Sequence, residues 1–286
     1  MKLKNKKELT VNEAWETLFT THNILNTISQ KGIFSITANQ IKEFKEPRLM
    51  AKFDSSEQLP KIFEKNKINI LPTSRSSYVL GRFLLYEELP KLTEHVTKME
   101  QVIPPDFESI NINNITSEAN AIHLLTLTNM LDDFLATENN YLTFSGRMGT
   151  PDFDFLVNTC DKKHQRIFVS RAQCEIDAGF ENTDCIVILE AKNVLHKDFH
   201  IRQLYYPYRL WRDKVNKPIR LVFAVYTNQI YHLIEYKFTE LADYSSIQLV
   251  QNKSYSLQDT KINLEELYAC LLYTSDAADD SLRVDL

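Results

Sequence analysis

The sequence predicts an α/β protein with a mainly helical N-terminal domain and a body built on a central sheet flanked by helices. Two observations predict it. Apolar residues recur at helical spacing near the N-terminus, whereas short runs rich in Ile, Val and Phe dominate the second half. With 286 residues the chain is longer than the roughly 100 to 200 residues of one domain, so two domains are expected.

The N-terminal domain begins with two helical patterns that end at Gly32. Their apolar positions are Ala14, Trp15, Leu18 and Phe19, followed by Ile24, Leu25 and Ile28. Thr37 and Gln40 have the spacing of a capping box and open a short helix over 38–44. Extended segments follow at 68–71 and 77–80. This order is compatible with a winged-helix or helix-turn-helix DNA reader, and also with a small helical bundle that has no DNA role.

The remaining boundaries follow from composition. We expect an N-terminal domain over 1–100, a linker over 101–116 that contains Pro104-Pro105, and a second domain over 117–269. Residues 270–286 form a tail that resembles the in-frame translation of an adapter from sequencing libraries. We therefore expect this tail to be non-native and the natural chain to be cut near Ala269.

In the second domain, hydrophobic periodicity predicts one helix, three strands, a second helix and two further strands. The helices are expected at 118–136 and 200–214, and the strands at 153–157, 166–177, 185–191, 219–226 and 230–238.

Charge and composition limit the function. The net charge is −5, yet residues 1–82 hold 14 Lys/Arg against 8 Asp/Glu, which suits a basic DNA-binding module on an acidic body. Five glycines form no phosphate-binding loop, and no serine-nucleophile elbow is present. The four cysteines form no Cys-x-x-Cys pair, and neither a secretory signal nor a membrane span is expected, so a cytoplasmic location follows.

The chemistry is expected in the segment 173–192. Polar residues alternate along its first strand, so Gln173, Glu175 and Asp177 share one face. The next strand, 185–189, is wholly apolar and reads as a central strand covered on both sides. It ends in Glu190-Ala-Lys192, and charges at the end of a buried strand are costly unless they are paired or bound to a metal.

The hairpin register decides which carboxylates meet. A turn centred on Thr183/Asp184 places Asp177 opposite Glu190, whereas a turn centred on Asn182/Thr183 places Glu175 there. Either way, two carboxylates lie about 5 Å apart at their Cβ atoms. A hard cation such as Mg²⁺ would neutralise them. A sheet-end salt bridge of Lys192 with Glu175 or Asp177 is the alternative.

These residues resemble the signature of the PD-(D/E)XK nuclease superfamily, an acid on one strand followed by acid-any-lysine on the next. The resemblance implies a restriction-endonuclease-like core in which Asp177 and Glu190, with Glu175 as a replacement or assistant, bind Mg²⁺. It implies that Lys192 helps to position or activate water and stabilises the pentavalent phosphate. Gln203 resembles the Gln/Tyr helix motif of RecB-like members, although Pro207 stands where tyrosine is usual.

The blocks at 46–54, 70–83 and 202–209 resemble those of predicted bacterial type II restriction endonucleases, and this broader likeness covers most of residues 10–240. It implies a Mg²⁺-dependent, sequence-specific endonuclease that cuts double-stranded DNA and belongs to a restriction-modification system with a cognate DNA methyltransferase encoded nearby. Symmetrical cutting of two antiparallel strands suits a twofold assembly, so a homodimer is expected. Within the N-terminal domain, DNA contacts are expected from Arg48, Lys52, Arg75 and Arg82. Two alternatives stay open: a repair or recombination nuclease of the same fold, and a non-catalytic DNA-binding protein.

Overall fold

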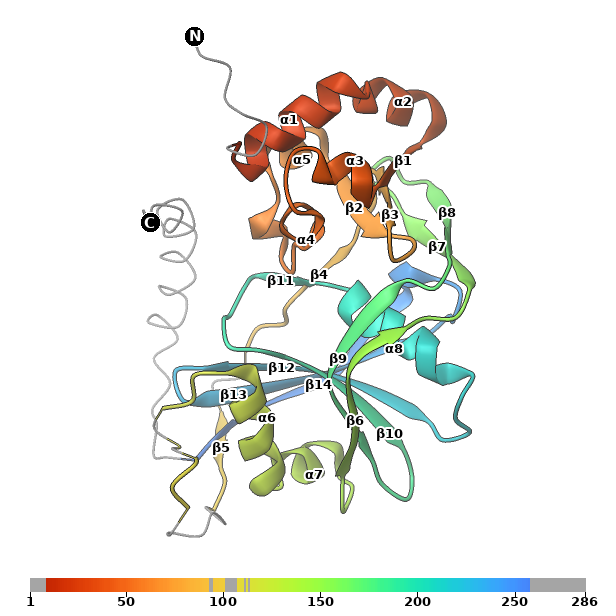
Figure 1. The fold of residues 1–286 in the computed structure, drawn as a ribbon. Coiled ribbons are helices and arrows are strands. Elements are labelled where there is room, and N and C mark those ends of the chain that lie inside the picture. Colours follow the sequence, from red (N-terminus) through yellow and green to blue (C-terminus); the bar gives the residue numbers. More distant parts are fainter. Residues whose placement is uncertain (1–8, 93–94, 101–106, 111, 113, 258–286) are drawn as a thin grey trace.

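The computed structural model describes residues 9–92, 95–100, 107–110, 112 and 114–257. The expected tail at 270–286 lies outside the described residues, as does part of the expected linker. The chain forms an N-terminal module of helices and a small sheet, joined to a larger body on which helices flank a seven-stranded sheet (Figure 1).

The N-terminal module has its own core, formed by residues between Ala14 and Leu80 around Trp15 and Phe63. Its helices are α1 (Val11–Thr21), α2 (Ile24–Lys31), α3 (Ala38–Lys42), α4 (Pro47–Ala51), the 3-10 turn η2 (Ser56–Gln58) and α5 (Lys61–Asn66). Its antiparallel strands are β1 (Ile33–Thr37), β2 (Asn69–Pro72) and β3 (Ser77–Gly81), in the order β1-β3-β2. The expected capping box is confirmed: the Thr37 hydroxyl accepts from the Gln40 N–H, and the Gln40 side chain accepts from the Thr37 N–H.

The body is organised by a mixed sheet in the order β5-β14-β13-β12-β10-β9-β6. Its strands are β5 (Val96–Lys98), β6 (Tyr141–Gly149), β9 (Gln173–Glu181), β10 (Ile186–Lys192), β12 (Ile219–Thr227), β13 (Ile230–Phe238) and β14 (Ile247–Ser256). Strand β10 runs parallel to β12 and antiparallel to β9. The expected α/β class, with a mixed central sheet flanked by helices, is confirmed at this level.

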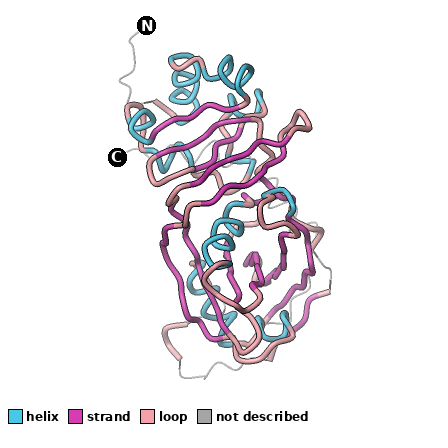
Figure 2. The backbone as a smooth tube through the Cα atoms, turned by 90° about the vertical axis from the view of Figure 1, so that its right-hand side faces the viewer, coloured by secondary structure: helices cyan, strands magenta, loops and turns pink. Residues whose placement is uncertain are grey.

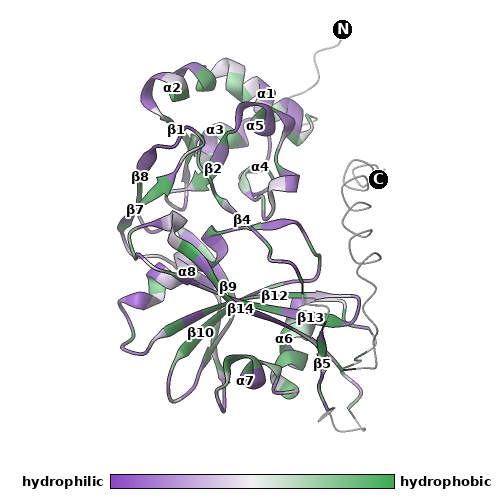
Figure 3. Cartoon of the chain, turned by 180° about the vertical axis from the view of Figure 1, so that it is seen from behind, coloured by the Kyte–Doolittle hydropathy of each residue, from purple (hydrophilic) through white to green (hydrophobic). Residues whose placement is uncertain are grey.

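Helices cover both faces of the sheet. One face packs against α6 (Glu118–Leu127) and α7 (Met130–Leu135), and the opposite face packs against α8 (Arg202–Arg212). Two short sheets join the two parts. The sheet of β4 (Tyr86–Glu88) and β11 (Asp198–His200) lies between the module and the large sheet, and the sheet of β7 (Phe153–Asn158) and β8 (His164–Val169) lies beside the module (Figures 1 and 2). Strand β10 is apolar from Ile186 to Leu189 and buried throughout, as expected for a central strand (Figure 3).

The structure corrects the expected domain boundary. Residues 82–100 were assigned to the N-terminal domain, yet β4 pairs with β11 and β5 joins the large sheet. The N-terminal module therefore ends near Gly81, where its last strand ends. Residue spacing alone did not show this, because both strands are three residues long and pair with partners far away in the sequence.

Two expected elements are each divided in two. The helix over 118–136 breaks between α6 and α7, because Asn129 adopts a left-handed conformation with φ of 54°. The strand over 166–177 becomes β8 and β9, because Arg171 between them has φ of 50°. Strands β6 and β14 were not expected; no residue of β6 is fully buried, and β14 is buried only over its last three residues.

Candidate functional site

The β9–β10 hairpin has the first of the two expected registers. Leu189 pairs with Ala178, so Glu190 and Asp177 are the next facing positions. The regular ladder stops there: an Asp177 carboxylate oxygen accepts a hydrogen bond from the Ala191 backbone N–H at 2.9 Å. The Asp177 side chain thus takes the place of a backbone acceptor, which fixes its carboxylate beside the end of β10.

Glu190 and Lys192 form a buried ion pair at the end of β10. Their side chains are only 8% and 15% exposed, and the distance from Lys192 Nζ to Glu190 Oε1 is 2.7 Å. The same oxygen accepts a hydrogen bond of 2.5 Å from the Gln203 side-chain amide on α8. Gln203 is itself buried, so its hydrogen bond fixes the orientation of the Glu190 carboxylate from the face of the sheet that α8 covers.

Glu175 does not join this group. Its side chain is 48% exposed and pairs with Arg147 on the neighbouring strand β6, at 3.4 Å. The sequence left open whether Glu175 or Asp177 faces Glu190, and the register places Asp177 there. Glu175 lies two residues before Asp177 along β9, beyond the part of β9 that pairs with β10.

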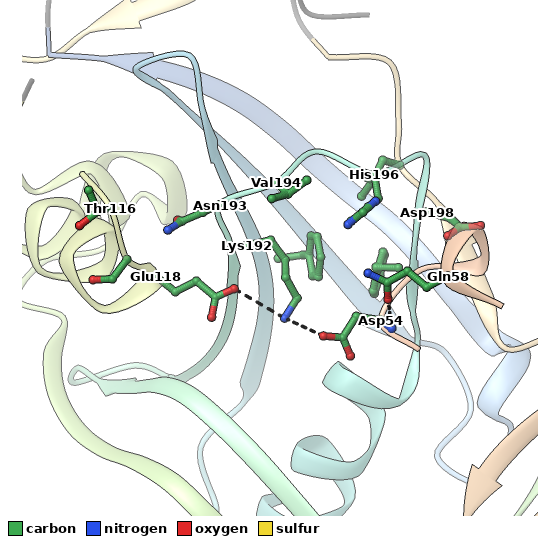
Figure 4. Close-up of a pocket in the computed structure, with 13 residues that line it drawn as sticks. Asp54, Gln58, Thr116, Glu118, Lys192, Asn193, Val194, His196 and Asp198 are labelled. Atoms are coloured by element: carbon green, nitrogen blue, oxygen red, sulfur yellow. Dashed lines mark hydrogen bonds and ion pairs between the residues drawn. The ribbon is translucent and has the colours of Figure 1, made fainter. Parts of the chain in front are cut away.

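Two carboxylates that the sequence prediction missed approach Lys192 from other elements. The Asp54 carboxylate, from the segment after α4, lies 3.7 Å from Lys192 Nζ, and the Glu118 carboxylate, at the start of α6, lies 4.0 Å away. Figure 4 shows the ammonium between them. These residues line a cavity of about 360 Å³, together with Asn193, His196 and Phe199 among others.

The pKa values of two acids and of the lysine at this site are all raised, but for different reasons. Burial raises the pKa of Glu190 to about 8, with Asp177 adding to the rise and Lys192 opposing it. Burial raises the pKa of Glu118 as well, and Asp177 and Asp54 add to that rise. Burial lowers the pKa of Lys192, but the surrounding carboxylates outweigh it, so this pKa is raised and the ammonium stays charged.

The donor chemistry at this site suits a hard cation. Asp177 and Glu190 provide carboxylate oxygens close enough for one to raise the pKa of the other. Mg²⁺ commonly binds one or two carboxylates and completes its shell with water or phosphate oxygens. Within the described ranges, no group of three or more His, Cys, Asp or Glu side chains is arranged to hold a metal by protein ligands alone. Any cation here would therefore use few protein ligands.

The four residues expected to contact DNA lie on or beside several elements of the N-terminal module. Arg48 is exposed on α4, and Arg75 is exposed in the turn between β2 and β3. Arg82 is half-buried directly after β3. Lys52 is exposed and lies 3.6 Å from Asp54, which lines the cavity.

Two family models match the chain. The larger match, to the domain of unknown function DUF6997, spans residues 81–256, more than half of the chain. The chain belongs to the DUF6997 family. The domain of unknown function DUF6996 matches residues 12–80, so the DUF6997 region begins where the N-terminal module ends. In the DUF6997 region lie Asp177, Glu190 and Lys192, whereas Asp54 lies in the DUF6996 region.

No curated protein and no solved structure matches the chain. None of the described helices is both long and apolar enough to cross a membrane.

Proposed function

We propose that this protein is a Mg²⁺-dependent, sequence-specific endonuclease that hydrolyses phosphodiester bonds in double-stranded DNA, as a type II restriction enzyme does. The observation that carries the proposal is the end of β10. The acid-any-lysine triplet Glu190-Ala-Lys192 forms the last three residues of this buried central strand. Asp177, from the paired strand β9, accepts a hydrogen bond from the Ala191 N–H in the middle of the triplet. This is the pattern of the PD-(D/E)XK core, and it supports assigning the mixed sheet to that fold.

Each residue of the site has a separate role in the proposed reaction. Asp177 and Glu190 would hold Mg²⁺, which when bound supplies positive charge at the phosphate and lowers the pKa of a bound water. Lys192 holds a positive charge beside these acids, where it can orient a water and stabilise negative charge on the phosphate. Gln203 donates to Glu190 and fixes its carboxylate. Apolar side chains, with Ile188 and Phe223 among them, pack on the same side of the sheet.

The N-terminal module supports the DNA-reading part of the proposal. Its order of helices followed by the β2–β3 hairpin, with the sheet order β1-β3-β2, is similar to that of a winged helix. Arg75 occupies the turn of that hairpin, and Lys61, Lys65 and Lys67 lie exposed on or beside α5. Exposed basic residues on one small module provide the phosphate contacts that DNA binding needs.

The test is incubation of plasmid DNA with the purified protein and Mg²⁺. Discrete fragments are expected, and Asp177→Ala and Lys192→Ala should abolish them while Glu175→Ala, the matched exposed acid of β9, should not. Random degradation would favour a repair or recombination nuclease. Salt-sensitive DNA binding without cleavage at any metal concentration would instead make the protein a non-catalytic DNA binder.

Cutting both strands at one site suits a twofold assembly, so we propose a homodimer. A DNA methyltransferase that modifies the same sequence would be its partner in protecting the host DNA. Sedimentation of the protein with and without a DNA duplex measures the oligomeric state, and a monomer on cleaved DNA would contradict the dimer.

A further inference from the structure

The segment 53–56 connects the N-terminal module to the site. On the module side, Phe53 is part of the module core, and the Trp15 indole N–H donates to the Met50 carbonyl at 2.9 Å. On the body side, the His200 backbone N–H donates to the Asp54 carbonyl at 2.9 Å, next to the β4–β11 sheet. The backbone of Asp54 is therefore held by both parts of the chain.

A buried carboxylate of the body reinforces this connection. Asp198, which is 6% exposed, accepts hydrogen bonds from the Ser55 hydroxyl at 2.7 Å and from the Ser56 backbone N–H at 2.8 Å. The Ser56 hydroxyl donates to its second oxygen. We call these three bonds the Asp198 clamp. Hydrogen bonds to a charged, buried acceptor are among the stronger ones. Because the clamp holds Ser55 and Ser56, it also restricts the position of Asp54, which directly precedes them.

The clamp directs the Asp54 side chain at the lysine of the site. Asp54 Oδ2 lies 3.7 Å from Lys192 Nζ, on the opposite side of the ammonium from Glu118 (Figure 4). Among the described residues of the N-terminal module, Asp54 is the one with an ion pair to Lys192. Glu190 and Glu118, the other partners of this lysine, both belong to the body.

We propose that Asp54 is a positioning residue for Lys192, supplied by the DNA-reading module and held in place by the Asp198 clamp. This inference rests on the proposed nuclease function and deepens it: the cleavage step requires the module to be seated on the body. Without the Asp54 carboxylate, the flexible Lys192 side chain has partners only on the body side and moves toward Glu190 and Glu118. Its ammonium is then no longer held where it serves the phosphate.

The experiment separates DNA binding from cleavage in the full-length protein. DNA affinity is measured by fluorescence anisotropy without Mg²⁺, and the cleavage rate is measured in single turnovers with enzyme in excess over a DNA duplex. For Asp54→Asn we expect at least a tenfold slower cleavage step with DNA affinity within threefold of wild type. Asp54→Glu should restore part of the rate, because it returns a carboxylate.

One further variant, with a control, keeps the inference falsifiable if Asp54→Asn does not fold. Asp198→Asn weakens the clamp without touching Lys192, and it should also slow cleavage while DNA affinity is kept. Asp161→Asn is the matched control, because Asp161 is exposed and bonds to Thr159 and Lys163 in the turn after β7; its rate should equal that of wild type.

Wild-type cleavage rates in both Asp54→Asn and Asp198→Asn would overturn the inference and leave the proposed function standing. A loss of rate accompanied by an equal loss of DNA affinity would also overturn it, since that result shows a role in binding. A wild-type protein that does not cleave DNA would overturn the proposed function, and the inference with it.

Discussion

The two ends of the β9–β10 hairpin carry ion pairs with the same length and different surroundings. At the turn end, Lys217 Nζ lies 2.7 Å from Glu181, and both side chains are more than one third exposed. At the open end, Lys192 Nζ lies 2.7 Å from Glu190, and both are mostly buried. Exposed pairs contribute little to stability, whereas buried charges cost desolvation and persist where they have another use. The contrast supports the proposal that the open end of the hairpin holds the functional site.

The largest expected effect is on DNA cleavage. Asp177→Asn removes a carboxylate ligand of the proposed Mg²⁺ but keeps an oxygen that can accept the hydrogen bond from the Ala191 N–H. Cleavage should therefore fall by at least about 100-fold with little unfolding. Glu175→Gln, on the same strand, should leave the rate nearly unchanged, because Glu175 pairs with Arg147 at the surface. Single-turnover assays measure both, and equal losses in the two variants would contradict the assignment of Asp177.

The next effect is on stability at about pH 9. Lys192→Met leaves the Glu190 carboxylate buried without its ammonium partner, which should cost about 3–5 kcal/mol of unfolding free energy. The matched Lys217→Met at the turn end should cost less than about 1 kcal/mol. Urea denaturation of both variants gives the comparison. Similar losses would show that burial does not distinguish the two ends.

Replacement of Glu190 should reveal its raised pKa. The Glu190 pKa is about 8 in the folded protein, above its usual value of 4.5. The group's contribution to stability is therefore fully present below about pH 4.5 and is lost as pH rises through 8. Compared with wild type, Glu190→Gln should gain stability as pH rises across this window, by roughly 2–4 kcal/mol at pH 9 without Mg²⁺. Parallel stability curves for the two proteins would show that the pKa is not raised.

The smallest expected effect is stabilisation by the metal. Because Mg²⁺ binds the ionised carboxylate, 10 mM Mg²⁺ should raise the unfolding free energy by on the order of 1 kcal/mol at pH 8.5 and by less at pH 6. Asp177→Asn should abolish this gain, while Glu181→Gln at the turn end should keep it. Differential scanning fluorimetry measures these shifts, and an identical gain in both variants would place the cation elsewhere.

The sequence predicted the local part of the site and missed its long-range part. Strand alternation and turn composition narrowed the residue that faces Glu190 to Asp177 or Glu175, and the observed register selects Asp177. Gln203 was expected only from its resemblance to the Gln/Tyr helix motif, and its hydrogen bond to Glu190 required the structure. The α/β class and the central position of β10 also came from local hydrophobic patterns.

Asp54 and Glu118 could not be found in this way. The two acids lie on different elements, and each comes close to Lys192 only when the module, α6 and the sheet pack together. No spacing rule links an aspartate of the N-terminal module to a lysine on β10. The same reason explains the misplaced domain boundary, since β5 is three residues long and its pairing with β14 depends on the whole sheet.

The hydrogen bond from the Ala191 N–H to Asp177 makes the site observable from the backbone. An amide proton that is bonded to a carboxylate changes its resonance frequency when that carboxylate gains a proton or binds a cation. Ala191 has a methyl side chain and no chemistry of its own to confuse the signal. A protein labelled with ¹⁵N therefore contains a native spectroscopic probe of the Asp177 charge state, which reports on the site without any mutation and without turnover.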